Sequence, residues 1–575
     1  MKNRFYITKN GRSEIVLLIP DNADEKTLFA AEEFKRFSEK STGAELLVVR
    51  ERDFAGGAAI SLGNTRLKER LFGNEKIRAG ESGYALRFER ELAFIFADSS
   101  AGIINGVYDL LKEACSLTIF GADEDLVYLK SKKSAFFSRK PKTVKCAIDY
   151  RQATYGEIRL NETLLRRFGM SVAPEKFVTG NVYHNAFDIM RYGGKEIPKE
   201  WLSEKGEQLC YTNPEMREAF AENLKRYLAD ADKCNLEQEY FVLGMEDNQG
   251  WCECENCKKI SPSDAMAGFT EYVSERINEG REKPIKFLCF AYYNTLPAPS
   301  VRLGENCGVY FAPIKADFRV PLTKKENAAY LAALKGWREK TDILFVWSYN
   351  FYTRDCFLTY DTFKAMRSNY KLFKKLNVNG LYDQTESFMK ISTGFGRLKG
   401  YMQSELMKNP AQSGRKLADK WFKACFYDNA KEMKKIFFDT LRLYGKIYKT
   451  EKIDLKETLS EGNPEKYSDI GRELKKFDCI KTDAKGIRTR LKIFLEKTLD
   501  VLDGITEKEK NELVKKRVLL EKIQYEYLYI FLAEEYEKKD LSERKKLLKN
   551  LLDFFGIEFY KEGGKATELF REQNN

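Results

Sequence analysis

The sequence predicts a (β/α)₈ barrel, preceded by a small α/β sandwich-like domain and followed by an α-helical domain. The chain has 575 residues, which is too long for one compact core. Between about residues 143 and 405, apolar strand-like runs alternate with helical patterns, and beyond about residue 409 the strand patterns largely vanish. These observations divide the chain into predicted domains over 1–140, 141–408 and 409–575.

The first predicted domain combines short strand-like runs with two helical patterns. Helices are expected over 25–41 and 100–115, where apolar residues recur at helical spacing. The expected strands are 14–19, 46–49, 59–62, 84–88 and 92–97, the last two as a hairpin. Mixed elements of this length are typical of a small α/β domain.

The middle domain repeats a strand-then-helix unit about eight times in roughly 260 residues, which is the size and period of a (β/α)₈ barrel. The expected strands are 144–150, either 170–172 or 177–178, 208–211, 240–245, 285–291, 308–313, 343–347 and 378–382. The expected helices are 214–231, 264–278, 325–340, 360–376 and 396–407. A doubly wound open sheet shares this local pattern and is the alternative.

The last third of the chain reads as amphipathic helices rich in Lys, Glu and Leu. Helices are expected over 431–448, 469–502 and 508–538. Their apolar stripes predict a packed helical domain. A partner-binding coiled coil is the alternative, but no strict heptad pattern runs long enough to favour it.

Composition narrows the classes of function. The net charge is +12, yet basic and acidic residues alternate along the C-terminal third, which is typical of solvated helical faces. No apolar run approaches the roughly 20 residues that span a bilayer. We therefore expect neither a nucleic-acid nor a membrane partner. The first 21 residues are charged where a signal peptide needs an apolar centre, so a cytoplasmic location is expected, with reduced thiols among the 12 cysteines.

Function in such a barrel lies at the carboxyl ends of the strands. The residues that follow the expected strands are carboxylates, amides and aromatic rings, a mixture that binds sugars by stacking and hydrogen bonding. The expected substrate-binding residues are Arg151, His184, Asn248, Tyr292, Asn294, Trp347 and Tyr349. A structural histidine and core packing are the alternatives for the single histidine and for Trp347. Phosphate-binding glycine motifs are absent from the sequence.

Carboxylates occur at two of these strand ends: Glu246 and Asp247 at one, Asp383 and Glu386 at the other. Glycoside hydrolysis needs one protonated carboxyl to release the leaving oxygen and one charged carboxylate to attack, activate water or steer the substrate. We expect Glu246 to be the acid and Asp247 to orient or stabilise a charged intermediate. Glu386 or Asp383 is the expected second carboxylate. Exposed loop carboxylates without a catalytic role are the alternative.

A CxCxxC motif follows directly, formed by Cys252, Cys254 and Cys257. Three thiolates within six residues can face one Zn²⁺ ion, and structural zinc takes four ligands. Cys210 and Cys289 are both candidates for the fourth. We expect a structural zinc that holds the loop of Glu246 and Asp247, with loop thiols without metal as the alternative. No cofactor is expected for catalysis.

The order of ADSSAGIINGVYDLL, GMEDNQGWCECENC, VWSYNFY, VNGLYDQTES and a helical tail resembles the family labelled domain of unknown function 4838. Some members are classed as glycoside hydrolase family 163, retaining endo-β-N-acetylglucosaminidases that act on N-glycans. The resemblance implies site residues at Asp247, Asn248, His184, Trp347 and Tyr349, and an acidic residue at Asp383 or Glu386. It also implies an N-terminal domain like the non-catalytic one that precedes barrels in hexosaminidases and α-glucuronidases.

The sequence thus favours a glycoside hydrolase that acts on an oligosaccharide, and the resemblance implies one containing N-acetylglucosamine. Because no leader is visible, an imported oligosaccharide fits better than an intact extracellular glycoprotein. Two alternatives stay open. One is a non-catalytic carbohydrate-binding protein on the same scaffold, and the other is a nucleic-acid-binding or scaffold protein that uses the basic helical tail.

Overall fold

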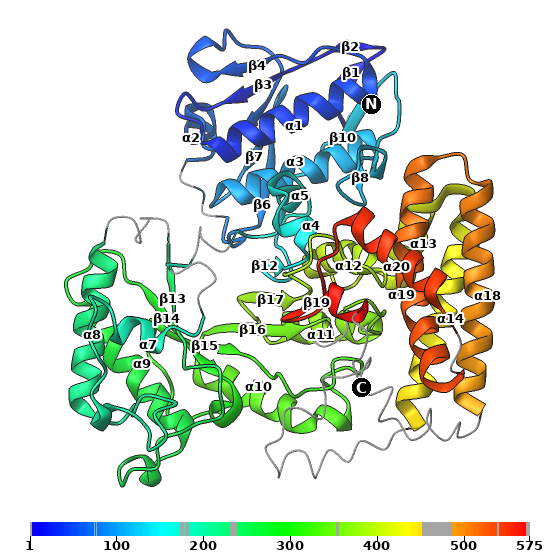
Figure 1. Cartoon of the computed structure of the whole chain (residues 1–575). Helices are drawn as coiled ribbons and strands as arrows, with labels where there is room; N and C mark the ends of the chain where they lie inside the picture. Colours follow the sequence, from blue (N-terminus) through cyan, green and yellow to red (C-terminus); the bar gives the residue numbers. More distant parts are fainter. Residues whose placement is uncertain are drawn as a thin grey trace.

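The computed structural model describes residues 3–73, 75, 77–172, 177–178, 183–230, 238–351, 356–450, 486–537 and 540–570. They form an N-terminal α/β domain, a curled parallel sheet with its helices, and a C-terminal helical domain (Figure 1). The N-terminal domain lies above the sheet in Figure 1, and the C-terminal helices lie to its right.

The N-terminal domain confirms the expected mixture of strands and helices. Its larger sheet has six strands in the order β11-β6-β7-β5-β3-β4, and a smaller sheet has the order β10-β1-β2. The elements are β1 (Arg4–Lys9), β2 (Arg12–Ser13), β3 (Val16–Ile19), α1 (Glu25–Thr42), β4 (Val48–Arg50), β5 (Ala59–Leu62), α2 (Arg66–Phe72), β6 (Tyr84–Glu89), β7 (Leu92–Phe96), α3 (Ser100–Cys115), β8 (Thr118–Ile119), β9 (Val127–Tyr128), β10 (Ala135–Ser138) and β11 (Lys142–Val144). A separate hydrophobic core from Phe5 to Phe137 holds this domain together.

The middle part of the chain is built on a six-stranded sheet in the order β12-β17-β16-β15-β14-β13, with every neighbouring pair parallel. The strands are β12 (Tyr150–Ala153), β13 (Tyr240–Leu243), β14 (Lys286–Ala291), β15 (Cys307–Phe311), β16 (Ile343–Tyr349) and β17 (Gly380–Gln384). Because all six run the same way, their carboxyl ends meet at one edge of the sheet.

The sheet curls into a half-barrel around the ring of Phe177. This buried ring lies 5.4 Å from the Tyr150 ring on one edge strand and 5.5 Å from the Tyr240 ring on the other. It also contacts Phe345 from the middle of the sheet at 5.7 Å. Rings from both edges and the centre can converge on one side chain only if the sheet is strongly curved.

A full eight-stranded barrel is not found among the described residues. The expected second strand is reduced to one parallel bridge between Phe177 and Tyr240 and a single backbone hydrogen bond from Ser171 to Arg151. The expected third strand, over 208–211, forms only an antiparallel bridge between Leu202 and Leu209. That segment is a loop because its buried Gln208 bonds to the chain after β13 and not to a neighbouring strand.

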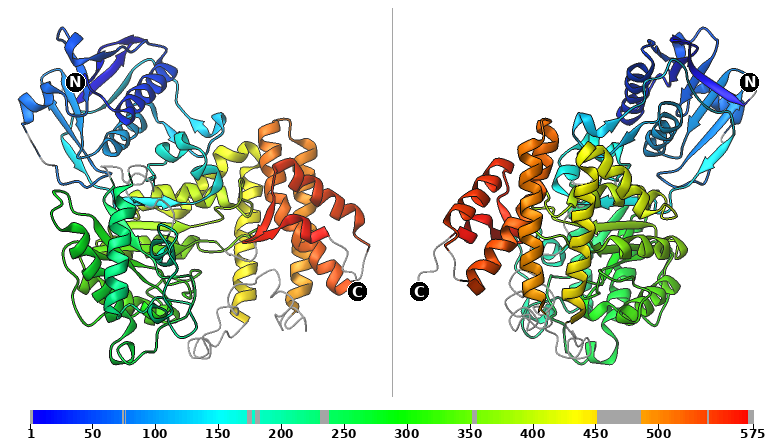
Figure 2. Two further views of the ribbon diagram at one scale, coloured as in Figure 1. Left: turned by 60° about the vertical axis from the view of Figure 1, so that its left-hand side comes forward. Right: turned by 90° about the vertical axis from the view of Figure 1, so that its right-hand side faces the viewer.

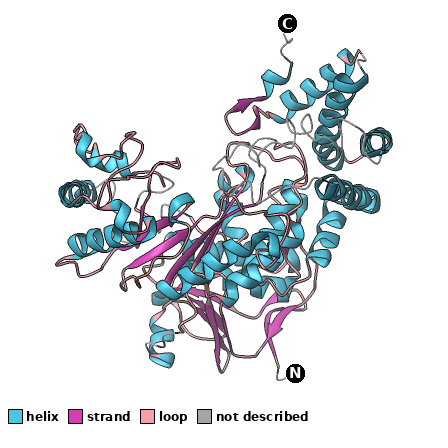
Figure 3. Ribbon diagram, turned by 90° about the horizontal axis from the view of Figure 1, so that it is seen from below, coloured by secondary structure: helices cyan, strands magenta, loops and turns pink. Residues whose placement is uncertain are grey.

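Helices cover the sheet and follow the strands, as the pattern of apolar residues predicts (Figure 3). They are α4 (Gly156–Arg159), α5 (Glu162–Arg167), α7 (Ala186–Met190), α8 (Pro214–Ala229), α9 (Pro262–Asn278), α10 (Ala328–Lys340), α11 (Phe363–Lys375) and α12 (Gly396–Lys408). The starts of α8 and α9 follow from their sequence: Asn213 and Ser261 cap the first turns, each with proline at the first position.

The described C-terminal part is helical, and residues 469–485 and 538 of the expected helices lie outside the described ones. The helices are α13 (Gly414–Phe426), α14 (Ala430–Thr450), α18 (Ile487–Lys508), α19 (Glu512–Glu537) and α20 (Ser542–Phe555). A short hairpin that the sequence pattern did not predict follows them, β18 (Phe559–Lys561) and β19 (Gly564–Lys565). In the described part of the chain, no helix combines the length and apolar character needed to cross a bilayer.

The helical domain shares its hydrophobic core with the sheet, so the two form one packed unit. Buried polar contacts reinforce this joint. Arg517 on α19 pairs with Asp123 and Asp125 of the loop that precedes β9. On the same helix, the Glu521 carboxyl accepts the Phe395 N–H at 2.8 Å, at the start of α12. Burial raises the pKa of Glu521 to about 8.

We predict that Glu521→Gln changes how stability depends on pH. The folded protein keeps Glu521 protonated up to about pH 8, whereas the unfolded chain ionises it near its ordinary pKa. The wild type therefore loses stability as the pH rises toward 8, by about 1.4 kcal/mol per pH unit at most. Glutamine still accepts the Phe395 N–H but does not ionise. In thermal unfolding, the Tm of the variant minus that of the wild type should rise between pH 5 and pH 8.

The matched control is Glu512→Gln, which removes a largely exposed carboxylate from the same helix. Its Tm difference from the wild type should stay constant with pH. A constant difference for the Glu521 variant as well would contradict the assigned protonation of this buried group.

Candidate functional site

The carboxyl edge, defined as the ends of β13, β14, β16 and β17 with the residues that follow them, gathers several of the predicted side chains. Asp247 follows β13, Tyr292 follows β14, and Trp347 and Tyr349 lie at the end of β16. The segment that carries His184 runs beside the end of β13, where Asn185 N–H donates to the Gly244 carbonyl. Residues from four separate stretches of sequence are thus neighbours here.

Five packed rings form what we call the aromatic floor: Tyr183, Phe290, Tyr310, Trp347 and Tyr382. The Trp347 ring lies 4.6 Å from Tyr382 and 4.8 Å from Tyr183. Its indole N–H donates to Gln384 at 2.8 Å, and the side chain is partly exposed. An indole fixed on one side and open to solvent can stack against the C–H face of a sugar. Tyr349 lies nearly parallel to Trp347 and 6.2 Å away.

Asp247 is held in place and yet open to solvent. The hydroxyl of the buried Tyr292 donates to its Oδ1 at 2.9 Å, while 63% of the Asp247 side chain is exposed. Nε2 of His184 lies 3.9 Å from the same oxygen. A carboxylate with one oxygen anchored and the rest accessible can act on a bound ligand.

The tautomer of His184 follows from its other nitrogen. Nδ1 lies 2.6 Å from the Met245 carbonyl oxygen, which can only accept a hydrogen bond, so Nδ1 carries a proton. In the neutral ring, Nε2 then presents its lone pair toward Asp247. The ring stacks on Phe290 of the aromatic floor at 5.5 Å. Nε2 and the carboxylate are two acceptors side by side, which suits a ligand hydroxyl or a proton between them.

Gly244 allows the chain after β13 to lie close to the segment of Tyr183 and His184. A Cβ at position 244 would lie 1.3 Å from the Tyr183 carbonyl oxygen. Asn185 fastens the contact, because its side-chain oxygen accepts the Gly244 N–H and its side-chain amide donates to the Val242 carbonyl. Glycine is therefore required here for its lack of a side chain, and the position of His184 depends on it.

Glu246 points away from its neighbour Asp247. Its carboxylate accepts the Phe187 N–H at 2.9 Å in the first turn of α7, and its backbone is bracketed by the side-chain amide of Gln208. Burial raises the pKa of Glu246, while the Phe187 N–H acts in the opposite direction. The geometry assigns Glu246 to holding α7 and not to the aromatic floor.

Asp383 lies on the other side of the sheet from the aromatic floor. Successive side chains of β17 alternate, so Tyr382 and Gln384 face the floor and Asp383 faces the helices. It is fully buried, and it accepts hydrogen bonds from Asn350, from Tyr370 on α11 and from Gln403 on α12. Burial raises its pKa. A carboxyl enclosed in this way fastens helices to the sheet.

Glu386 is also enclosed, in the loop after β17. Its side chain is buried, and burial raises its pKa to about 7 while the charge of Lys399 lowers it. Lys399 is itself buried, with a pKa lowered to about 8, and donates to the carbonyls of Asn350 and Tyr360. Neither Asp383, within β17, nor Glu386, in the loop after it, is open to solvent.

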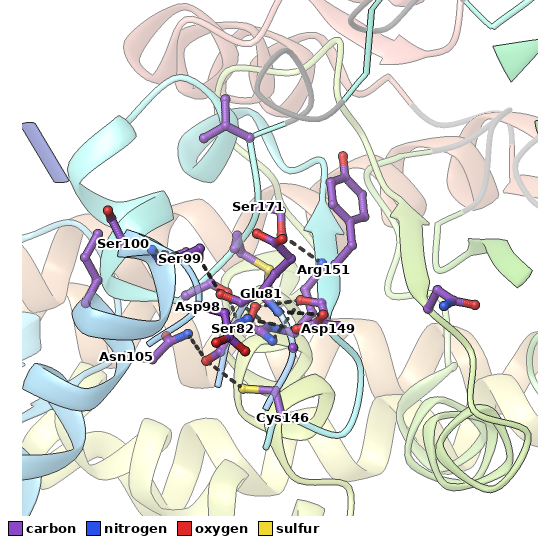
Figure 4. A pocket seen from close by; sticks show the side chains of 18 of the residues that line it. Glu81, Ser82, Asp98, Ser99, Ser100, Asn105, Cys146, Asp149, Arg151 and Ser171 are labelled. Atoms are coloured by element: carbon purple, nitrogen blue, oxygen red, sulfur yellow. Dashed lines mark hydrogen bonds between the residues drawn. The ribbon is translucent and has the colours of Figure 1, made fainter. Parts of the chain in front are cut away.

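Arg151 lies at the amino end of the sheet, away from the carboxyl edge. It is 1% exposed, and its guanidinium donates to the carbonyls of Gly169 and Ile148. It borders a cavity of about 610 Å³ between the N-terminal domain and the amino ends of the strands (Figure 4). The expectation that Arg151 lies beside the other site residues is wrong, because β12 carries it near its start.

Hydrogen bonds at the wall of this cavity connect the N-terminal domain to the parallel sheet. The Asp149 carboxylate accepts the backbone N–H groups of Glu81 and Ser82, both at 2.8 Å, and the Ser82 hydroxyl donates to the Asp149 carbonyl (Figure 4). In folds with parallel strands and alternating helices, residues at the amino ends of the strands serve stability. We therefore infer that these bonds hold the N-terminal domain to the parallel sheet.

The two amides expected at the site differ in availability. Asn248 uses its side chain within its own loop, accepting from Gln208 and Gly250 and donating to the Glu207 carbonyl. Asn294 is exposed and donates to the Gln249 carbonyl at 2.8 Å. Asn294 is therefore free to meet a ligand with its oxygen, while Asn248 shapes the loop.

A carboxylate that sequence reasoning missed reaches the carboxyl edge from the far end of the chain. Glu562 is exposed in the turn of the β18–β19 hairpin, which is drawn in red in Figure 2. The hairpin docks through a hydrogen bond from Cys356 N–H to the Tyr560 carbonyl. Partial loss of hydration and the charge of Asp247 raise the pKa of Glu562. Only the folded chain brings residue 562 near residue 247, and no local motif signals it.

A known structure shares this fold, and a second is similar at a lower score. BtGH115A, a family GH115 4-O-methyl-α-glucuronidase with specificity for decorated arabinogalactans, matches with a TM-score of 0.57 at 12% identity, over 96% of this chain and 77% of that one. The chitobiase FjGH20 of Flavobacterium johnsoniae gives a TM-score of 0.43 at 14% identity, over 96% and 93% of the two chains. The first match shows that the chain has a glycosidase-like fold.

Comparison by sequence identifies a family but no characterised relative. No curated protein matches the chain. A family model described as Domain of unknown function (DUF4838) matches residues 126–439, which is more than half of the chain. This range begins before β9 of the N-terminal domain, includes all six strands of the parallel sheet and ends within α14. The chain therefore belongs to the DUF4838 family.

Proposed function

We propose that this protein is a glycoside hydrolase that cleaves an oligosaccharide at the carboxyl edge, with Asp247 as a catalytic carboxylate. One observation carries the proposal: Asp247 is anchored by Tyr292 and exposed to solvent beside His184. The aromatic floor next to it offers Trp347 for stacking against a sugar ring. The glycosidase-like fold supports the same conclusion.

In this proposal, Asp247 acts in its charged form. A Tyr292 hydroxyl that donates to Oδ1 leaves the second oxygen for the substrate. From that position the carboxylate can attack the anomeric carbon, activate water or steer an acetamido group of the substrate. His184 Nε2 accepts a substrate hydroxyl and so helps to fix the sugar.

We assign the role of acid to Glu562. Glycoside cleavage needs a carboxyl that is protonated when the leaving oxygen departs, and Glu562 has its pKa raised by partial loss of hydration and by the charge of Asp247. Glu386 also has a raised pKa, but its side chain is buried. The exposure of Glu562 therefore favours the carboxylate on the hairpin over the buried one after β17.

The substrate we propose is an oligosaccharide that contains N-acetylglucosamine. Support comes from the resemblance to family members classed as endo-β-N-acetylglucosaminidases. The matched GH115 structure is named for a 4-O-methyl-α-glucuronidase, so a uronic acid is the competing sugar. A panel of aryl β-N-acetylglucosaminides, aryl α-glucuronides and N-glycan oligosaccharides separates the two by which member is cleaved.

A non-catalytic carbohydrate-binding protein is the second candidate. It is favoured by one specific observation: of the four carboxylates expected from the sequence, only Asp247 lies exposed at the carboxyl edge. Calorimetric titration with an intact glycan, followed by analysis of the glycan after long incubation, distinguishes the candidates. Binding without any product would favour the second one.

We predict that Asp247→Asn lowers glycan cleavage by about 10²–10⁴-fold, because the amide cannot carry the charge that the reaction needs. Glu562→Gln should lower it as well, and most strongly at low pH, where the wild-type acid is protonated; the difference should shrink as rising pH deprotonates the wild-type acid. The measurement is initial rate against pH on the best member of the panel.

Asp188→Asn is the matched control, since Asp188 is an exposed carboxylate on α7 and outside the carboxyl edge. Its rate should equal that of the wild type. Undiminished cleavage by the Asp247 variant would refute the assignment of this residue.

We also predict that Gly244→Ala destabilises the protein by roughly 1–3 kcal/mol, the usual cost of forcing an atom into a packed site. The new methyl group would displace the segment of Tyr183 and His184, so glycan affinity should fall together with Tm. Gly504→Ala is the control: it lies in α18 with open space around it, and it should leave binding unchanged and raise stability slightly. Equal Tm values for the two variants would contradict the close contact.

A further inference from the structure

Four cysteine sulfur atoms gather beside the loop that carries Asp247. Cys210 precedes α8, and Cys252, Cys254 and Cys257 follow β13, yet the four Sγ atoms all lie within 4.8 Å of one another. Cys210 Sγ is 3.7 Å from Cys254 Sγ and 3.8 Å from Cys257 Sγ. The fold thus brings a fourth thiol, 42 residues before the motif, to the three of the CxCxxC sequence.

These spacings match a tetrahedral metal site. Zinc–sulfur bonds of about 2.3 Å place the four sulfurs of a tetrahedron about 3.8 Å apart. A disulfide would instead bring two sulfurs to about 2.05 Å. Cys289, the other candidate for the fourth ligand, lies buried within β14 with its thiol directed at the Gly308 carbonyl.

The cluster stands apart from the hydrophobic cores of the molecule. Cys210, Cys252 and Cys257 are buried and form a small cluster of their own, with Cys254 packed against it. Thiols that simply fill space would be expected within a core of aliphatic and aromatic side chains. A separate group of four mutually adjacent thiols is explained by a shared ligand.

A hydrogen-bond donor and a positive charge lie next to the four thiols. The Thr212 hydroxyl lies 3.1 Å from Cys257 Sγ, within donating distance. Arg217, whose Nε donates to the Tyr211 carbonyl, places a positive charge that interacts with Cys210 and Cys257. Four thiolates around one Zn²⁺ carry a net charge of −2, so an arginine and a hydroxyl donor suit this neighbourhood.

We propose that Cys210, Cys252, Cys254 and Cys257 bind one Zn²⁺ ion as a closed structural site. Four protein ligands leave no open position for water or substrate, so the ion has no part in the chemistry of cleavage. Binding releases the thiol protons and leaves each sulfur as a thiolate.

The metal fastens the loop of Asp247. Gln208, two residues before Cys210, brackets the Glu246 backbone through both of its amide atoms and donates to Asn248. The zinc ion would join the same two segments a few residues further along. Asp247 therefore lies next to a loop that is fixed at two points, and the cysteines act as positioning residues.

The test begins with the full-length protein. Purified without chelator, it should contain one zinc ion per chain by elemental analysis. Refolded with Co²⁺, it should show the intense visible bands of tetrahedral cobalt and the near-ultraviolet charge-transfer band of thiolate ligands. A protein that contains no zinc after growth and refolding with excess zinc, and gives no such cobalt spectrum, overturns the proposal.

Two variants identify the ligands. Cys210→Ser should lose the zinc or hold it at least ten-fold more weakly, and its cobalt spectrum should lose charge-transfer intensity. Cys289→Ala, the matched control, should keep one zinc ion and an unchanged cobalt spectrum. If Cys210→Ser does not fold, titration of the wild type with a mercurial decides: zinc should be released in step with the modification of four thiols. Release without modification of these thiols would contradict the site.

These readouts do not depend on the proposed hydrolase activity. Zinc bound by these ligands in a protein that cleaves no glycan would leave the metal site standing while the functional proposal fails. Glycan cleavage by a protein that binds no zinc would support the functional proposal while the metal site fails.

Discussion

The parallel direction of six strands is the constraint on which the rest of the structure depends. Because every strand of the sheet ends at the same edge, residues after β13, β14, β16 and β17 meet there although they are spread over more than 130 positions of the sequence. Curling around Phe177 then turns the inner side chains toward one another. The aromatic floor and the anchored Asp247 both follow from these two facts.

The two-residue period of a strand decides which of the predicted carboxylates can meet a ligand. A strand alternates its side chains between the two faces of a sheet, so Tyr382 and Gln384 face the aromatic floor while Asp383 fastens helices. The sequence indicates which residues lie near the end of β17, and it does not show which face each one takes. Glu246 and Asp247 differ in the same way just after β13, where one holds α7 and the other stays exposed.

Local patterns predicted local elements well. The ranges expected for α3 and β5 agree with the structure, because apolar spacing and flanking turn residues fix such elements within their own sequence. The expected strand over 208–211 was wrong, since its pattern contains the polar Gln208, which bonds to another loop. The contribution of Glu562 could not be predicted, and the sequence could not choose between Cys210 and Cys289, because both questions depend on packing between segments far apart in the chain.

The measurement that tests the central claim most directly is a crystal structure of the Asp247→Asn variant with an intact oligosaccharide bound. The account predicts a pyranose ring in van der Waals contact with Trp347, at about 4 Å, and a glycosidic linkage within about 3 Å of the side chain at position 247. An ordered sugar in the cavity bordered by Arg151 and Asp149, with nothing bound beside Trp347, would contradict it.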